Sequence, residues 1–187
     1  MEVDAKTQRL ATAVQEYSPN CDDRPSGTVI DLVVIHGISL PPGEFGGGHI
    51  TALFTNQLDP DAHPSFAEIA DLRVSAHVLI ERNGRVVQFV RFDRRAWHAG
   101  QSQFLDRARC NDFSIGIELE GTDTQAYTQI QYETLIDILK ALKTAYPSLS
   151  YICGHEHIAP ARKTDPGPAF DWGRLGGQLP QGMAIRT

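Results

Sequence analysis

Apolar and polar positions along the chain alternate in a way that predicts several short strands. Residues 31–36, DLVVIH, form a short apolar run with β-branched side chains, which predicts a buried strand. In residues 114–120, SIGIELE, apolar side chains alternate with other residues, so one face is apolar and the other carries two glutamates. Residues 73–90 contain two extended runs around Asn83 and Gly84, the dipeptide most typical of a hairpin turn. These runs are expected to form one sheet.

The longest helical pattern begins near Thr128 and ends at Pro147. Thr128 and Gln131 predict a capping box, and apolar residues then recur at helical spacing up to the proline. A shorter helical face covers residues 49–58, and residues 149–155, LSYICGH, are the next predicted strand. A strand, a long helix and a strand imply a right-handed parallel crossover. We therefore expect an α/β fold with a mixed sheet, a parallel core and an antiparallel hairpin, flanked by helices.

The length of the chain suits one domain. Its 187 residues are enough for a full core and too few for two domains of ordinary size. Hydrophobic residues make up 41% and charged residues 21%, which is ordinary for a globular protein. We expect a single domain over residues 1–187, with its core at about 29–175 and residues 1–28 as a loose lead-in.

The charge balance and the apolar runs exclude several classes of partner. The net charge is -6 and only residues 91–95, RFDRR, are locally basic, so nucleic acid is not an expected partner. No stretch approaches the length of a membrane span, and the N-terminus lacks the apolar segment of a secretory signal. The three cysteines, Cys21, Cys110 and Cys153, are scattered, which favours reduced thiols. We expect a cytoplasmic protein that does not bind membranes.

Two of the seven histidines lie where predicted strands end. His36 and His155 each close a predicted strand, and Glu118 lies near the end of another. Sites in α/β sheets gather at the carboxyl ends of strands, so these three side chains could converge. Catalytic zinc takes three protein ligands from His, Asp, Glu or Cys, and a carboxylate beside it could act as general base. His77 alternates within a strand and fits an ordinary core histidine.

The stretch GHEHIAPARKTDPGPAFDW, residues 154–172, is the densest in polar chemistry. If the preceding strand continued, His155 and His157 would face one side and could chelate a metal; if it ends at His155, His157 lies on the surface or behind the ligands. Asp165 lies in a proline-stiffened loop, which suits a preorganised ligand but also an ordinary turn. Lys163 is either an oxyanion-stabilising cation beside Asp165 or a surface lysine.

Motifs for other chemistries are missing from the chain. There is no GxSxG elbow and no HExxH helix, and no GK[ST] follows the glycine-rich residues 37–48, so there is no P-loop. Cys110 and Cys153 lack the local signature of a cysteine nucleophile, although a cysteine–histidine pair stays open at this point.

Five motifs resemble those of a known family: VVIHGISLPPGEFGG, LRVSAHVLIERNG, RRAWHAG, CNDFSIGIELEGTDT and GHEHIAPARKTDPGPAFDW. In this order, from about Asp31 to Trp172, the chain resembles the zinc-dependent N-acetylmuramoyl-L-alanine amidases, which are related to phage lysozyme-type amidases and peptidoglycan recognition proteins. The resemblance implies a mixed sheet flanked by helices, with one zinc ion. It also covers most of the chain, which makes it far more specific than any single motif.

The resemblance assigns a role to each of the polar residues singled out above. It implies that His36, His155 and Asp165 are the zinc ligands. It implies that Glu118, the first glutamate of IELEG, activates the attacking water, and that Lys163 stabilises the tetrahedral oxyanion.

The resemblance also implies substrate contacts, and the chain departs from the family at two positions. Trp97 of AWHAG would form a wall of the substrate groove, and Arg73 and Arg109 would meet the carboxylates of the peptide, which guanidinium groups bind in bidentate fashion. Gly37 stands where the family usually has Asn, which would remove a side-chain contact to substrate. His157 stands where Asn or Asp is common, which adds a histidine near the three ligands.

The expected function follows from this resemblance. It is the zinc-dependent hydrolysis of the amide between (1,6-anhydro)-N-acetylmuramic acid and L-alanine in muropeptides, as part of peptidoglycan recycling. The expected partner is a small glycopeptide, and the expected state is a monomer. Two alternatives are a muropeptide-binding receptor without catalysis, which the intact set of polar residues argues against, and a zinc amidase that lyses intact cell wall.

Overall fold

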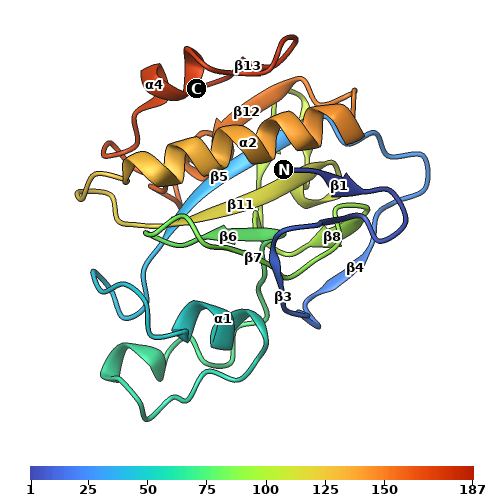
Figure 1. Cartoon of the computed structure of the whole chain (residues 1–187). Helices are drawn as coiled ribbons and strands as arrows, with labels where there is room; N and C mark the ends of the chain where they lie inside the picture. Colours follow the sequence, from blue (N-terminus) through green and yellow to red (C-terminus); the bar gives the residue numbers. More distant parts are fainter.

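A computed structural model describes all residues, 1–187, and is built on a seven-stranded sheet (Figure 1). From one edge to the other the strands are β13 (Ala184–Ile185), β12 (Tyr151–Gly154), β5 (Leu32–Ile38), β11 (Ser114–Glu120), β6 (Val78–Ile80), β7 (Val86–Gln88) and β3 (Val14–Gln15). β11 runs parallel to both β5 and β6, and β12 runs parallel to β5, whereas β6 and β7 form an antiparallel hairpin. The predicted mixed sheet is therefore confirmed.

The long helix α2 (Gln129–Ala145) covers one face of this sheet (Figure 1). The predicted capping box is present, since the Thr128 hydroxyl accepts from the Gln131 backbone N–H and the Gln131 side chain accepts from the Thr128 backbone N–H. Leu135 and Leu139 of the apolar stripe are fully buried against the inward side chains of β5 and β11. Burial of this stripe, more than helix propensity, is what holds α2 in place.

The opposite face of the central strands carries the polar residues. Alternate residues of a strand share a face, so Ser114, Gly116 and Glu118 of β11 all point away from α2. In the β5–β11 register, Glu118 lies directly opposite His36. The sheet therefore places a carboxylate and an imidazole side by side on the face that α2 leaves free.

A second apolar cluster lies beyond this face and includes α1 (His49–Phe54) (Figure 1). Ile50, Leu53 and Phe54 are buried in it, as their helical spacing predicts. The helix ends at Phe54 and does not reach residue 58 as predicted. The reason is local: Asn56 has a φ of 59°, a left-handed conformation that a right-handed helix cannot continue through.

Two predicted strand boundaries also differ from the structure. The hairpin turn is confirmed, with Gly84 at a φ of 83°, but β6 begins only at Val78 and not at residue 73. Before that point the backbone leaves the ladder, since the Ser75 N–H donates to the carbonyl of Trp97. The second difference concerns β12, which was predicted to extend to residue 155. It ends at Gly154, and the chain continues directly into the short helix α3 (His155–Ile158).

Residues 1–28 are not the loose lead-in that we predicted. Besides β3, they contain three further short strands, and the buried side chain of Leu10 joins the main core. The remaining elements are β1 (Val3–Asp4), β2 (Arg9–Leu10), β4 (Cys21–Asp23), β8 (Arg94–Ala96), β9 (Gln103–Phe104), β10 (Arg107–Ala108), the 3-10 turns η1 (Pro64–Phe66) and η2 (Cys110–Asp112), and α4 (Trp172–Gly176). None of the helices combines the length and the apolar character that crossing a membrane requires.

Candidate metal centre

Three side chains meet at the carboxyl end of the central strands. His36 lies near the end of β5, His155 is the first residue of α3, and Asp165 follows in the loop after α3. The two Nδ1 atoms are 3.0 Å apart, and Asp165 Oδ2 lies 3.1 Å from that of His36 and 3.2 Å from that of His155. The structure thus brings together the three residues for which a metal-ligand role was expected.

The loop that carries Asp165 is held by two hydrogen bonds to its backbone carbonyls. The backbone N–H of Glu156 donates to the carbonyl of Asp165, over 2.9 Å. The buried hydroxyl of Tyr127 donates to the carbonyl of Pro166, over 3.0 Å. Because neither contact uses the carboxylate of Asp165, its Oδ2 is left to face the two imidazoles.

The outer nitrogens of both imidazoles have their own partners. His155 Nε2 lies 3.2 Å from the carbonyl oxygen of Ala99, and His36 Nε2 lies 2.9 Å from Nδ1 of His98. A carbonyl oxygen only accepts, so Nε2 of neutral His155 carries the proton and its Nδ1 is a bare acceptor. Two imidazole nitrogens and a carboxylate oxygen that converge in this way suit a divalent metal ion. Tetrahedral ligands at zinc-like bond lengths are separated by roughly 3.3 Å, close to the spacings found here.

Burial keeps His36 in the protonation state that a metal requires. Burial, with the neighbouring His155, lowers the pKa of His36 to about 4, so its imidazole is neutral at neutral pH. Asp165 offers a carboxylate oxygen beside the neutral imidazole of His36.

Glu118 is the unusual carboxylate of this site. Its side chain is buried, and its Oε2 atom has no hydrogen-bond partner in the protein. Burial raises its pKa well above the ordinary value, the charge of Asp165 adds to the shift, and the charge of Lys163 opposes it. A buried polar atom without a partner is rare, and at a cavity wall it marks a group that can exchange protons with a bound molecule.

A single cavity of about 220 Å³ connects these groups. Its polar lining consists mainly of His36, His98, Glu118, His155, Lys163 and Asp165. Trp97 lines it as well, and the indole N–H donates to Oδ1 of Asp22 over 3.2 Å, which fixes the plane of the ring. Leu53 and Phe54 of α1 supply an apolar wall. The lining is therefore part charged and part apolar, as in sites for small polar molecules with an apolar part.

Arg73 and Arg109 do not belong to this lining. Arg73 is exposed, although its neighbours Leu72 and Val74 both face the cavity. Arg109 is also exposed and forms an ion pair of 3.2 Å with Asp112. The structure thus places both guanidinium groups outside the cluster that surrounds the candidate ligands.

His157 faces away from the ligands, and the reason is the early end of β12. Within the helical turn of α3, positions two residues apart no longer share a face, so His155 and His157 diverge. His157 Nδ1 accepts from the Gly154 backbone N–H over 2.8 Å, and its ring packs on Trp172 at 5.5 Å between centroids. The open His-x-His alternative is therefore not realised.

Two residues that support the site, His98 and Asn111, were not singled out from the sequence. His98 contacts His36 directly, and the Asn111 side chain accepts from the backbone N–H groups of His98 and Ala99. Glu120 is a structural carboxylate, accepting from the backbone N–H groups of Gly46 and Arg82 and so fastening the glycine-rich loop. The alternation in SIGIELE contained part of the signal, because it places Ser114 and Gly116 on the face of Glu118.

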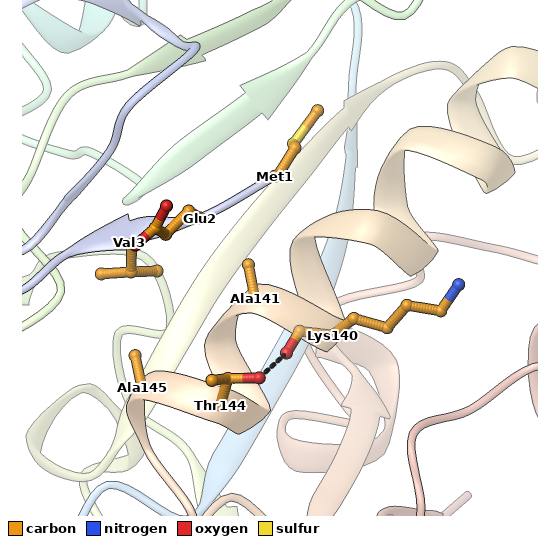
Figure 2. A pocket seen from close by; sticks show the side chains of 7 residues that line it. All are labelled: Met1, Glu2, Val3, Lys140, Ala141, Thr144 and Ala145. Atoms are coloured by element: carbon orange, nitrogen blue, oxygen red, sulfur yellow. Dashed lines mark hydrogen bonds between the residues drawn. The ribbon is translucent and has the colours of Figure 1, made fainter.

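A second cavity of about 220 Å³ lies between the N-terminal residues and α2 (Figure 2). Its lining contains one carboxylate, from Glu2, and one ammonium group, from Lys140, and otherwise aliphatic groups and Thr144. The Thr144 hydroxyl donates to the Lys140 carbonyl within the helix, over 3.0 Å. No imidazole reaches this cavity, so it offers no comparable metal or proton chemistry.

Comparison with known proteins agrees with this geometry. A family profile described as N-acetylmuramoyl-L-alanine amidase matches residues 26–168. The chain belongs to this family of amide-bond hydrolases. It is 63% identical over 167 residues to the 1,6-anhydro-N-acetylmuramyl-L-alanine amidase AmpD of Escherichia coli (strain K12), which is 89% of this chain and 91% of that one. AmpD of Haemophilus influenzae is 52% identical over 167 residues, covering 88% and 91%.

Solved structures extend the comparison. A crystal structure of a selenomethionine derivative of AmpD superposes with a TM-score of 0.93 at 57% identity, covering 96% of this chain and all of that one. The amidase AmiD from E. coli, in complex with anhydro-N-acetylmuramic acid-L-Ala-D-gamma-Glu-L-Lys, gives a TM-score of 0.57 at 30% identity, with 83% and 60% covered. The Drosophila peptidoglycan recognition protein SD shares the fold alone, at 17% identity and a TM-score of 0.56, covering 91% of this chain and 94% of that one.

Proposed function

We propose that this chain is a zinc-dependent amidase that cleaves the amide between (1,6-anhydro)-N-acetylmuramic acid and L-alanine of muropeptides, in peptidoglycan recycling. One observation supports this most strongly: the triad of His36, His155 and Asp165 opens into the same cavity as the buried carboxylate of Glu118. The names of the AmpD relatives support the substrate, and so does the anhydromuramyl peptide in the AmiD complex.

The metal would be held by Nδ1 of His36, Nδ1 of His155 and Oδ2 of Asp165. Two neutral imidazoles and one carboxylate leave a single positive charge on a divalent ion and a fourth position for a small ligand. When bound there, zinc would polarise the scissile carbonyl and lower the pKa of a water molecule.

Glu118 is the proposed proton carrier. It takes a proton from the water that attacks the carbonyl carbon, and it delivers that proton to the amide nitrogen as the carbon–nitrogen bond breaks. The products are the free lactyl carboxylate and the amino terminus of the peptide. A carboxyl group with a raised pKa suits both steps, because it holds the proton long enough to hand it on.

Lys163 is the proposed stabiliser of the oxyanion. Its side chain lines the cavity, and its charge acts on Glu118 strongly enough to oppose the rise in the pKa of that residue. An ammonium group at this position would attract the negative charge that develops on the carbonyl oxygen during attack.

The substrate would extend from the metal along the Trp97 wall. We propose that the sugar or the peptide packs on this indole, and that Arg73 and Arg109 bind peptide carboxylates from the rim of the site. Both arginines are exposed, and a ligand carboxylate would have to compete with Asp112 for the guanidinium group of Arg109. We further propose that residues 1–187 act as one domain, as a monomer and in the cytoplasm.

Hydrolysis of a defined muropeptide tests the proposal. The purified chain is incubated with an anhydro-muropeptide, with and without a chelator, and the released peptide is measured by mass spectrometry. We expect release that the chelator abolishes and added zinc restores. Binding without release would favour a receptor, and cleavage of intact sacculi in preference to the muropeptide would favour a lytic amidase.

A further inference from the structure

A chain of hydrogen bonds runs from the metal ligand His36 into the protein interior. His36 Nε2 lies 2.9 Å from His98 Nδ1, and His98 Nε2 lies 3.2 Å from the Ser114 hydroxyl. That hydroxyl donates to the backbone carbonyl of Cys110 over 2.6 Å. All four residues are buried, which strengthens the hydrogen bonds between them.

The direction of this chain follows from its last member. A carbonyl oxygen only accepts, so the one proton of the Ser114 hydroxyl is committed to Cys110. The Ser114 oxygen then accepts from Nε2–H of His98, and a neutral His98 ring has a bare Nδ1. This Nδ1 accepts from Nε2–H of His36, and the bare Nδ1 of His36 is left to face Asp165.

These hydrogen bonds could also run in the opposite direction, from Ser114 to His98 to His36, and that arrangement would block the metal site. The Ser114 hydroxyl would then donate to His98, and His98 would donate to Nε2 of His36. His36 would carry its proton on Nδ1, the atom that a metal needs. The reversed state loses the short contact between the Ser114 hydroxyl and the Cys110 carbonyl, which therefore favours the first direction.

Two further contacts hold His98 in the position that its hydrogen bonds to His36 and Ser114 require. The ring lies on Gly116, where an added Cβ would come within 2.4 Å of His98 Cγ. The Asn111 side chain accepts from the backbone N–H groups of His98 and Ala99, over 3.1 and 2.8 Å. The same short segment thereby presents the Ala99 carbonyl to His155 and the His98 ring to His36.

We propose that His98 and Ser114 are positioning residues that hold His36 in the tautomer whose Nδ1 is free to bind the metal. The inference rests on the proposed metal site and goes beyond it, because neither residue is itself a ligand. Partners of this kind behind a histidine ligand typically change metal affinity by about 10- to 100-fold.

Zinc affinity of the full chain is the first test, measured by competition with a chromophoric chelator. We expect Ser114→Ala to bind Zn²⁺ about 10- to 100-fold more weakly, because His98 Nε2–H then has no acceptor. Ser18→Ala is the matched control, since Ser18 is also buried and donates to a backbone carbonyl, that of Phe54, and neither a histidine nor Cys110 is among the hydrogen-bond partners of its hydroxyl. We expect the control to keep the wild-type affinity, with both variants shown to be folded by circular dichroism.

A pair of substitutions at His98 separates hydrogen bonding from space filling. The amide oxygen of Asn in His98→Asn can replace Nδ1 as the acceptor for His36, whereas His98→Leu removes the acceptor and fills more of the space. We expect His98→Leu to lose about 10- to 100-fold in zinc affinity and His98→Asn to recover most of that loss. If His98 only filled space, His98→Leu would keep more zinc affinity than His98→Asn, because leucine leaves the smaller void.

The tautomers can also be observed without any variant. Long-range proton–nitrogen correlation spectra of the metal-free wild-type chain should show His98 protonated on Nε2 with a bare Nδ1. A proton on His98 Nδ1, or wild-type zinc affinity in folded Ser114→Ala and His98→Leu, would overturn the inference. A wild-type chain that binds no zinc would instead refute the proposed function, so the two failures are distinguishable.

Discussion

His36 and Glu118 lie directly opposite each other on the two central parallel strands, β5 and β11. Backbone pairing alone therefore sets the spacing between a metal-ligand candidate and the carboxylate that would move the proton. A register shift of one residue would turn Glu118 to the α2 face and replace it with an apolar side chain. The sheet is thus the part of the fold that fixes the positions of these two residues relative to each other.

Replacing Glu118 by glutamine should separate catalysis from metal binding. The amide keeps the shape of the side chain but cannot accept a proton, so we expect kcat to fall by about 10²- to 10⁴-fold. Zinc affinity should stay at the wild-type value, because Glu118 is not among the three converging ligand atoms. Steady-state kinetics and chelator competition measure the two quantities. Glu133→Gln, on the exposed side of α2, is the control, and full activity in Glu118→Gln would refute the assigned role.

Zinc should raise the stability of the folded chain. A ligand that binds only the folded state at about 100 times its Kd stabilises by roughly 2.7 kcal/mol. We expect a thermal unfolding midpoint that rises with added zinc, and a much smaller rise in Asp165→Asn, which loses the anionic ligand. Asp61→Asn, at an exposed position away from the cavity, should respond like the wild type. An equal rise in Asp165→Asn would place the metal elsewhere.

Local patterns predicted β5, β11 and α2 because the residues that determine each of these elements are close together in the sequence. The β5 and β11 runs are apolar on the face that α2 covers, and the capping box is complete within four residues of Thr128. The convergence of His36, His155 and Glu118 followed from one rule, that sites lie at the carboxyl ends of parallel strands. Each of these inferences needs only sequence neighbours and one fact of topology.

The rest of the site depends on contacts between distant residues, which no local pattern contains. Asp165 reaches the imidazoles because Tyr127, from the segment before α2, holds the carbonyl of Pro166. The His98 ring is placed by its contacts with Ser114 and Gly116 of β11, which come later in the chain. The resemblance to a known family, and not spacing, is what singled out Asp165 over the plain-turn interpretation.

Gly37 and Tyr127 should be energetically coupled. A Cβ at position 37 would lie 2.2 Å from the Tyr127 hydroxyl oxygen but 3.5 Å from the ring carbon that carries it. Gly37→Ala should therefore cost about 1–3 kcal/mol in the wild type, through steric overlap. In a Tyr127→Phe background the overlap disappears, so the same change should cost less.

Urea unfolding of the two single variants and the double variant measures this coupling. Tyr127→Phe alone should cost about 1 kcal/mol, because it removes the hydrogen bond to Pro166. Strict additivity of the two substitutions would show that the glycine is not needed to make room for this hydroxyl.

His77 should make the metal-free protein less stable as the pH falls. It is fully buried, Nδ1 accepts from the Gly116 N–H, and Nε2 donates to the Arg94 carbonyl. Burial, with the charge of Arg24, lowers its pKa to about 3. Between the ordinary value of about 6.5 and this lowered pKa, the unfolded chain binds a proton that the folded chain does not. The stability that neutral His77 contributes is therefore present above pH 6.5 and is lost as the pH falls towards 3.

The variant His77→Gln isolates this effect, because every other titrating group is common to both proteins. The variant should be the less stable of the two at neutral pH. The gap should then narrow below pH 6.5, by on the order of 1 kcal/mol per pH unit. Urea unfolding from pH 7.5 to 4.5, with chelator present so that metal binding does not contribute, measures the gap. A gap that stays constant over this range would mean that His77 takes up its proton in the folded state as readily as in the unfolded chain.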